Sequence, residues 1–555
     1  MNKQNAWWKE AVIYQIYPRS FKDSNGDGIG DLQGIIAKLD YIKNLGVDAV
    51  WVNPIFTSPN DDNGYDISDY RNIMTDFGNM QDFDELLEKI HQKELKLILD
   101  LVPNHSSDEH SWFQESKKSR DNPYRDYYHW WPAEKGKPNH RESYFDINRD
   151  AWQYDEQTNA YYLHYFSKKQ PDLNWENPKL REEIYNILRF WFDKGVDGFR
   201  MDVIPFISKD TAFPPIPDRF DGNFGDFYAQ GPNLHKYLRE MNEQILSKYN
   251  CVSIAEGVGV KTDDVHLFID PERKELDMLY HFEGMGIGFT PDGFKEPHPD
   301  GFSLLEFKQV YTKWDKAFEK GWGTIYLGNH DQPRMLTRWG NDSTEFRQVS
   351  AKMLHTFLLT MRATPFIYYG DEIGMCNIKF DNITDYRDIE SINMHQYLKS
   401  TGGDLQRFME AQKITARDNG RTPFQWDNLA NAGFTSGIPW LKVNPNYKQV
   451  NAEAQENDPA SILNYVKNLI ALRKQYKTLI YGNYQLLDGS NKSVYTYSRE
   501  DADGLFIVLL NFTSVDADFN IGYDLTHAEL IVSNYQKEAN RNFLKPYEAC
   551  VFKLK

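Results

Sequence analysis

Short apolar runs of four to six residues alternate along most of this chain with longer amphipathic stretches, and no other feature limits the fold more. Runs of this length predict strands, whereas apolar residues at every third or fourth position predict helices. Strands that are separated by helices form parallel sheets, because a parallel pair needs a crossover connection. Eight strand-like runs occur in order, namely Ala11–Ile16, Ala49–Val52, Leu97–Val102, Gly198–Asp202, Val252–Ala255, Met278–Phe282, Thr324–Leu327 and Pro365–Tyr369.

Helical patterns lie between these runs, and their spacing favours a closed barrel over an open sheet. Eight strands with intervening helices are typical of the (β/α)₈ barrel, the TIM barrel, which is an α/β fold. The clearest helical patterns are Leu32–Leu45, Phe83–Lys93, Lys179–Lys194, Leu234–Lys248 and Ser350–Met361.

Three long excursions interrupt the barrel pattern, and the pattern changes near the C-terminus. Each excursion follows a strand, so all should lie on one face, and the longest should form an inserted subdomain after the third strand. Beyond about residue 479, short strands follow one another without helices, which predicts an antiparallel β domain. We therefore expect a barrel over 1–104 and 172–478, an inserted subdomain over 105–171, and a C-terminal β-sandwich domain over 479–555.

The composition excludes several classes of protein. A net charge of −18 over 555 residues disfavours binding to nucleic acid or anionic membranes and is compatible with a neutral ligand such as a sugar. Three scattered cysteines (Cys251, Cys376 and Cys550) give neither a disulfide framework nor zinc-ligand spacing. No apolar run reaches the length of a membrane span, and the first residues show no signal-peptide pattern. We expect a cytoplasmic monomer or weak homo-oligomer.

Acidic side chains lie at the ends of several strand-like runs, where a barrel has its active site. Asp100 lies in the third run, Asp202 ends the fourth, Glu256 follows the fifth, and Asp331 follows the seventh. Hydrolysis of a glycosidic bond needs two carboxyl groups, one to attack the anomeric carbon and one to protonate the leaving oxygen. Arg200 lies on the same side of its strand as Asp202 and would lower the pKa of that acid, whereas burial would raise the pKa of Glu256. Neighbouring strands would place the two carboxyl groups about 5 Å apart, as a retaining route requires.

Several of these segments, in this order and spacing, resemble the signature regions of the α-amylase family of glycoside hydrolases. YQIYPRSF (Tyr14–Phe21) and RDNGRTPFQW (Arg417–Trp426) further resemble its oligo-1,6-glucosidase branch. The family signatures are DLVPNH (Asp100–His105), QPDLNW (Gln170–Trp175), GFRMDV (Gly198–Val203), SIAEG (Ser253–Gly257) and NHD (Asn329–Asp331).

The resemblance implies a role for each matching residue. It makes Asp202 the nucleophile, Glu256 the general acid/base, and Asp331 the acid that binds the 2- and 3-hydroxyls of the sugar. It also implies that Asp66 and Arg334 pair around the terminal glucose, which would close the pocket and give exo action on small oligosaccharides. The other implied pocket residues are Tyr65, which would stack on the glucose, His105, Phe166, Arg200, Val203, His330 and Arg417.

Val203 and the loop after the sixth strand bear on the substrate. In the branch that this chain resembles, valine after the nucleophile accompanies α-1,6 linkages, although a β-branched residue also suits a strand. Sucrose isomerases share GFRMDV, but many have an RLDRD-like motif where this chain reads GMGIGFTPDGFKEP. A sucrose isomerase or hydrolase, and a broad α-1,4-glucosidase, remain alternatives, while a non-catalytic binding relative is disfavoured because all three acids are present.

A glycine-rich acidic loop, DSNGDGIGD (Asp23–Asp31), offers oxygens that suit a hard cation such as Ca²⁺. It resembles the calcium loop of the same branch and implies a structural Ca²⁺ site. A metal-free turn is the alternative. The implied ligands are Asp23, Asn25, Asp27, the Ile29 carbonyl and Asp31.

Overall fold

The computed structural model describes residues 6–220, 222–290, 294–299, 301–535, 540 and 542–554. In this part of the chain, eight parallel strands form one sheet in the order β11-β10-β9-β5-β2-β1-β13-β12. A parallel bridge joins Leu279 on β11 to Gly323, just before β12, and so closes the sheet into the predicted barrel. The strands are β1 (Ile13–Ile16), β2 (Ala49–Val52), β5 (Lys96–Leu101), β9 (Gly198–Met201), β10 (Val252–Gly257), β11 (Met278–His281), β12 (Thr324–Ile325) and β13 (Thr364–Tyr368).

The barrel strands are buried on both faces, which explains why their sequences are continuously apolar rather than alternating. One face fills the barrel and the other packs under the surrounding helices. β1, β2, β9, β11 and β13 are buried at every position. All eight strands lie where the sequence predicted them, so the (β/α)₈ prediction is confirmed.

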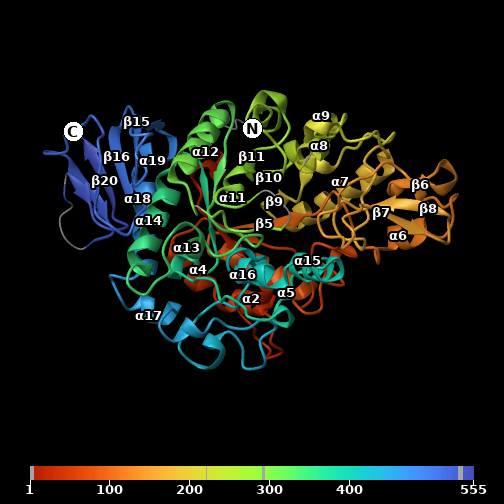
Figure 1. The fold of residues 1–555 in the computed structure, drawn as a ribbon, viewed down its shortest axis with the longest axis horizontal. Helices are drawn as coiled ribbons and strands as arrows, with labels where there is room; N and C mark the ends of the chain where they lie inside the picture. Colours follow the sequence, from red (N-terminus) through yellow and green to blue (C-terminus); the bar gives the residue numbers. More distant parts are fainter. Residues whose placement is uncertain are drawn as a thin grey trace.

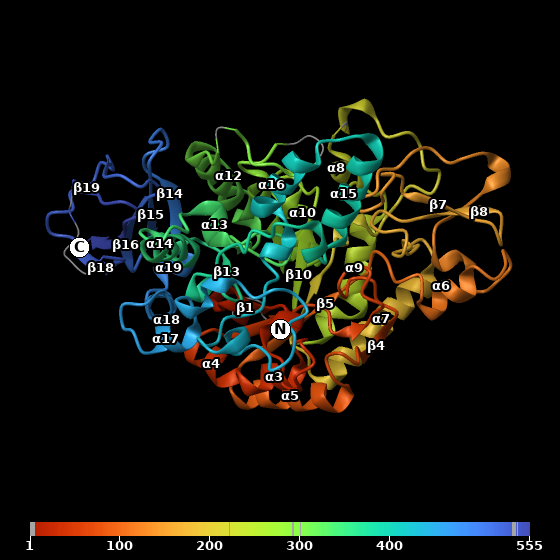
Figure 2. The ribbon, with the colours of Figure 1, turned by 60° about the horizontal axis from the view of Figure 1, so that its bottom comes forward.

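The helices around the barrel begin and end at residues that suit those positions. In α7 (Pro178–Lys194), the Asn177 side chain caps the first turn, Pro178 occupies the first helical position, and Gly195 ends the helix with a φ of 113°. Figure 2 shows α3 (Leu32–Ala37), α5 (Met80–Gln92) and α7 along the outer side of the barrel. Other barrel helices are α5 (Met80–Gln92), α9 (Leu234–Gln244), α12 (Leu304–Ala317), α14 (Arg347–Thr360) and α18 (Ile462–Gln475).

One helix prediction was wrong in its continuity. The stretch Leu32–Leu45 forms two helices, α3 (Leu32–Ala37) and α4 (Leu39–Leu45). Lys38 breaks the helix with φ −112° and ψ 9°, and its ammonium group lies 4.0 Å from the centre of the Trp426 ring. The partner ring is nearly 400 residues away in the sequence, so local periodicity could not have revealed this break.

The excursion after β5 forms a small subdomain with its own sheet. β6 (Trp130–Pro132), β8 (Ala160–Leu163) and β7 (Trp152–Asp155) pair antiparallel in that order, beside α6 (Ser111–Ser116). The buried ammonium of Lys209, after β9, donates to Asn104 Oδ1 at 2.7 Å and contacts Asp172 Oδ2 at 3.1 Å. This lysine thus ties the barrel to the two ends of the subdomain.

The C-terminal segment folds as an antiparallel β domain at the opposite end of the molecule from the subdomain (Figure 1). Alternate residues of β16 face the two sides of its sheet. Phe506, Val508 and Leu510 join the main core, whereas Ile507 and Leu509 pack in a second cluster. A two-stranded ribbon of β17 (Ala517–Asp518) and β19 (Phe543–Leu544) lies beside the main sheet. That sheet has the order β14 (Asn483–Leu486), β15 (Val494–Asp501), β16 (Gly504–Asn511), β20 (Ala549–Leu554) and β18 (Glu529–Ser533).

Cys251, Cys376 and Cys550 are buried free thiols. Across the described residues, no helix has both the length and the apolar character needed to cross a bilayer.

Candidate active site

Arg200 lies at the centre of the candidate active site, at the C-terminal end of β9, and is completely buried. Its Nη1 lies 3.1 Å from Asp100 Oδ1 and 2.5 Å from Asp202 Oδ1, and its Nη2 lies 2.5 Å from Glu256 Oε1. Its Nε donates to the Tyr280 hydroxyl at 2.7 Å. The parallel register sets Asp100 beside Arg200 and Glu256 beside Tyr280. Neighbouring strands therefore bring three acids around one guanidinium.

Asp202 and Glu256 are both buried, and burial dominates the pKa of each. It raises the pKa of Asp202, while the charge of Arg200 opposes that rise. It raises the pKa of Glu256 well above the usual value, again against the effect of Arg200 and with the help of the Asp202 charge. The expected rise for Glu256 is present. Arg200 lowers the pKa of Asp202 as expected, but the desolvation of this side chain outweighs the arginine, so the net direction is upward.

The second oxygen of Glu256 is held by the main chain. The Val203 N–H donates to Glu256 Oε2 at 2.7 Å. The Val203 side chain is buried in an apolar cluster that includes Tyr165 and Phe206, with Phe166 packed against it. Val203 thus contacts Glu256 through its backbone, while its side chain belongs to the apolar cluster.

Asp331 lies beyond β12 among cationic and histidine side chains. Its Oδ1 is 3.0 Å from Arg417 Nη1 and 3.3 Å from Arg421 Nη2, and its Oδ2 is 3.2 Å from His330 Nε2. Burial raises the pKa of Asp331, but His330 and the two arginines lower it by more, so the net direction is downward. Burial also lowers the pKa of His330 to about 3. Near neutral pH the two arginines therefore supply the positive charge beside Asp331.

The predicted aromatic and histidine residues line the same region. Tyr65 stacks on His330 with ring centres 5.1 Å apart, and its hydroxyl accepts from Asn53 Nδ2 at 2.8 Å. His105 lies 5.0 Å from the Phe166 ring. Burial lowers the pKa of His105 to about 3, so this imidazole is also neutral near pH 7.

The predicted pair of Asp66 and Arg334 is wrong, because in the described part of the chain each bonds elsewhere. Asp66 accepts hydrogen bonds from Ser58 at 2.9 Å and from the backbone N–H of Asp61 at 2.8 Å and of Asp62 at 3.1 Å. It therefore closes a local turn, which is a common role for aspartate. Arg334 is buried and donates to the carbonyl oxygen of Tyr369 at 2.5 Å.

An ion pair in this region instead joins a different acid to a different arginine, namely Asp62 to Arg417. Asp62 Oδ1 lies 3.4 Å from Arg417 Nη2, and its Oδ2 accepts from Gln170 at 3.1 Å. Asp388 also binds Arg417, with 3.1 Å to Nε, and lies 3.6 Å from Arg421. Asp62, Asp388, Gln170 and Arg421 were missed. The available signal was RDNGR, where two arginines four residues apart need acidic partners once they are buried.

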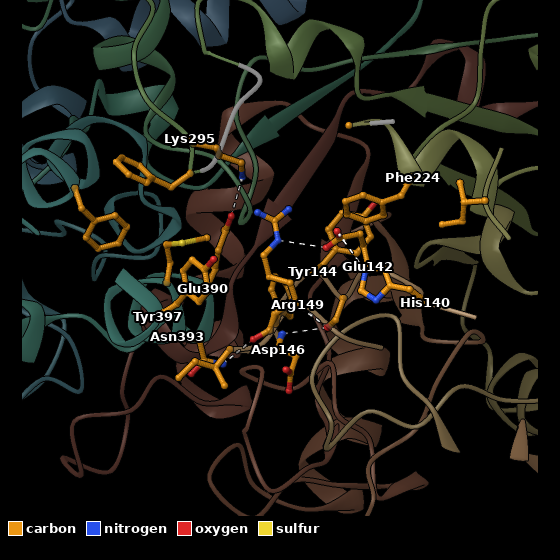
Figure 3. Close-up of a pocket in the computed structure, with 18 of the residues that line it drawn as sticks. His140, Glu142, Tyr144, Asp146, Arg149, Phe224, Lys295, Glu390, Asn393 and Tyr397 are labelled. Carbon is orange, nitrogen blue, oxygen red and sulfur yellow. Dashed lines mark hydrogen bonds and ion pairs between the residues drawn. The ribbon is translucent and has the colours of Figure 1, made fainter. Parts of the chain in front are cut away.

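A cavity of about 660 Å³ opens beside these residues (Figure 3). It is lined by the subdomain and by the segments after β9, β11 and β13, so all three excursions lie on one face as predicted. Arg417 borders it, 4.8 Å from the Phe145 ring and 3.4 Å from Glu390. The ammonium of Lys295 lies 3.6 Å from Glu390 across the same cavity. The cavity therefore adjoins Arg417, whereas Asp202, Glu256 and Asp331 are not among the residues that line it.

The predicted cation loop closes largely on itself. Asp23 accepts from the backbone N–H groups of Asn25 and Gly26, and Asn25 Nδ2 donates to Asp27 Oδ2 at 3.1 Å. Burial raises the pKa of Asp23, but the hydrogen bonds from Thr435 and from the loop lower it by more and keep the carboxylate ionised. Among the described residues, no group of three or more acidic, histidine or cysteine side chains lies close enough to hold a metal. The loop offers oxygen atoms, which are the ligands that Ca²⁺ prefers, and it is this donor chemistry that makes the loop compatible with the ion.

Comparisons with known proteins agree with this architecture. The alpha amylase catalytic-domain family model matches residues 15–482. The oligo-1,6-glucosidase of Parageobacillus thermoglucosidasius is 51% identical over 100% of both chains, and that of Bacillus cereus is 50% identical over 100% of both.

Solved structures give the same result. A mutant isomaltulose synthase from Erwinia rhapontici NX5, in complex with sucrose, superposes with a TM-score of 0.96 at 44% identity over 100% of both chains. The trehalulose synthase from Pseudomonas mesoacidophila MX-45 superposes with a TM-score of 0.95 at 45% identity over 99% of both. The barrel, the acids at its strand ends and the match over most of its length establish that this chain belongs to the alpha-amylase family of glycoside hydrolases.

Proposed function

We propose that this chain is an exo-acting, retaining α-glucosidase that hydrolyses terminal α-linked glucose, preferentially α-1,6, from short oligosaccharides such as isomaltose. The observation that supports this most strongly is the fork of Arg200, which bonds Asp202 and Glu256 at 2.5 Å each. Two carboxyl groups on one guanidinium are close together, as a double-displacement route requires.

In this proposal the two carboxyl groups share the chemistry. Asp202 attacks the anomeric carbon while Glu256 gives its proton to the glycosidic oxygen, so that the aglycone leaves and a glucosyl ester remains on Asp202. Glu256, now ionised, takes a proton from water, which attacks the ester and releases glucose with the α configuration retained. Asp331, held ionised by Arg417 and Arg421, would accept hydrogen bonds from the sugar hydroxyls.

Exo action rests on the contact between Asp62 and Arg417. This pair links the loop between β3 (Phe56–Thr57) and β4 (Asp69–Ile73) to the segment after β13, and both side chains are buried. A sugar bound at Asp202 would have the ion pair beside its non-reducing end, so a longer chain could not pass through. Asp62 and Arg417 would therefore close the pocket in place of Asp66 and Arg334, the pair that the sequence implied.

Parallel assays of glucose release from isomaltose, maltose, sucrose and trehalose, with products identified by chromatography, test the substrate assignment. Faster release from isomaltose than from maltose would support the α-1,6 preference. The names of the Parageobacillus and Bacillus relatives support that outcome. The isomaltulose and trehalulose synthases support the alternative of a sucrose isomerase, and isomers of sucrose among the products would favour it.

We expect Val203→Thr to lower the ratio of kcat/KM on isomaltose to that on maltose by about 10-fold, because it places a hydroxyl beside the bound linkage. Threonine keeps the branched shape at this buried position. The matched control is Val196→Thr, another buried valine that lies before the opposite end of β9. An unchanged ratio in Val203→Thr would remove the linkage role of this side chain.

We also propose that the Asp23–Asp31 loop binds a structural Ca²⁺ through Asp23, Asn25, Asp27, Asp31 and the Ile29 carbonyl. A chelator should then lower the melting temperature by about 2–5 °C, because a ligand that binds only the folded state stabilises it. Added Ca²⁺ should restore the melting temperature, and the Asp27→Ala variant should not respond to either treatment. Calorimetric scans that coincide with and without chelator would contradict the proposal.

A further inference from the structure

Val203, the residue after Asp202, has a backbone conformation that a β-branched residue rarely adopts. Its φ is 32° and its ψ is 40°, which lie in the left-handed region. The neighbouring backbone holds it there, because the Asp202 N–H bonds to the Leu101 carbonyl at 2.8 Å and the Val203 carbonyl accepts from the Phe206 N–H at 2.9 Å. Strained residues of this kind cluster at functional sites.

This turn lets the chain leave β9 while the Val203 N–H stays directed at Glu256. The N–H donates to Oε2 at 2.7 Å, while Arg200 holds Oε1 at 2.5 Å. The four residues from Arg200 to Val203 therefore contain Asp202 and also hold both oxygens of Glu256. A single strand end sets the relative position of the two acids.

We propose that the main-chain amide of Val203 is a positioning group that holds Glu256 in line with the glycosidic oxygen, and that the left-handed turn at Val203 aims this amide. The inference rests on the proposed role of Glu256 as general acid/base. It gives Val203 a second part in the reaction, which is independent of any contact between its side chain and the substrate.

The amide also affects the two charge states of Glu256 differently. A hydrogen bond from an N–H is stronger to a carboxylate than to a carboxylic acid, so the amide favours the ionised form. Burial favours the protonated form and raises the pKa of Glu256, while the bond from Val203 moderates that rise. Glu256 can then serve as acid in the first step and as base in the second.

Replacing Val203 by its α-hydroxy analogue tests this directly, because an ester lacks the N–H but keeps the valine side chain. We expect kcat on isomaltose to fall about 10- to 100-fold, since a hydrogen bond to a charged group is lost. The basic limb of the pH profile of kcat/KM should move about one pH unit upward, because the ionised form of Glu256 loses a donor. If the Val203 amide only stabilised the fold, its loss would lower activity without shifting the basic limb of the pH profile.

The matched control is the same ester at Ser208, whose amide makes no hydrogen bond to Glu256 in the described structure and whose replacement leaves the Val203 carbonyl unchanged. It should leave both kcat and the basic limb within about twofold and 0.2 pH units of the wild type, which is well below the loss expected for a bond to a charged group. A Val203 ester that matches this control overturns the proposal, and so does one that loses activity with an unmoved basic limb.

Hydrogen exchange gives a second measurement that does not depend on the ester. In Glu256→Ala the Val203 N–H loses its acceptor, so exchange should accelerate in the peptide that covers residues 202–206 and stay unchanged elsewhere on β9. Unchanged exchange in that peptide would overturn the proposal. If the wild type has no α-glucosidase activity, or if Glu256→Gln retains it, the proposed function fails first, and that failure is separate from this one.

Discussion

We expect the Asp202→Asn enzyme to lose at least about 10⁴-fold of its kcat on isomaltose and still to fold. An amide cannot form the glucosyl ester, so the double displacement stops at its first step. Folding persists because Arg200 keeps two acidic partners, with Asp100 at 3.1 Å and Glu256 at 2.5 Å. Asparagine also matches the size of aspartate and removes a negative charge from a crowded buried site.

Glucose release measures this loss, and thermal unfolding measured by circular dichroism verifies the fold. Asp193→Asn, on the exposed face of α7, is the matched control and should keep wild-type turnover. A fluorinated glucoside that reacts slowly should leave a glucosyl adduct on the peptide that contains Asp202. Turnover near the wild-type value in Asp202→Asn, or an adduct on another acid, would end the nucleophile assignment.

In the Glu256→Gln enzyme the loss of activity should depend on the leaving group. We expect a fall of about 10²- to 10⁴-fold on isomaltose, whose sugar leaving group needs a proton. The first step with an activated aryl α-glucoside should fall far less, and azide should restore turnover, because it attacks the glucosyl ester without a general base. Equal losses on both substrates with no response to azide would contradict the acid/base role.

The raised pKa of Glu256 also predicts how activity depends on pH. Burial raises the pKa of Glu256 well above the usual value, so the carboxyl keeps its proton at pH values where an ordinary glutamic acid is ionised. Activity should therefore persist through neutral pH and fall as the pH rises through that raised pKa. The basic limb should be absent in Glu256→Gln and unchanged in Glu243→Gln, a control on the exposed face of α9.

The sequence predicted the barrel well because its strands are buried on both faces. Such strands are short, apolar and bounded by polar residues, and no tertiary information is needed to find them. In the C-terminal domain the pattern is weaker at β14, whose residues are exposed or half-buried, and at the two-residue strands β17 and β19. A strand whose side chains do not alternate between clearly buried and clearly exposed has little of the hydrophobic pattern from which a strand is predicted.

The positions of the candidate acids could be predicted from the sequence, whereas the ion pairs of the pocket could not. Asp202 and Glu256 come at the ends of apolar strands, so the sequence alone gives their place in a barrel. Asp62 and Arg417 are separated by 355 residues and meet only through two loops. Asp66, four residues beyond Asp62, is equally acidic, and only the fold shows that it closes a turn instead.

The ion pair between Asp62 and Arg417 also governs how a chain of several glucose units is degraded. A pocket that ends at this pair has a single mouth, through which the freed glucose must depart before the next glucose can enter. A shortened chain cannot slide forward into an occupied, closed pocket, so it must dissociate after each cleavage. Degradation is then distributive, and every chain in a mixture shortens by one unit before many chains shorten by two.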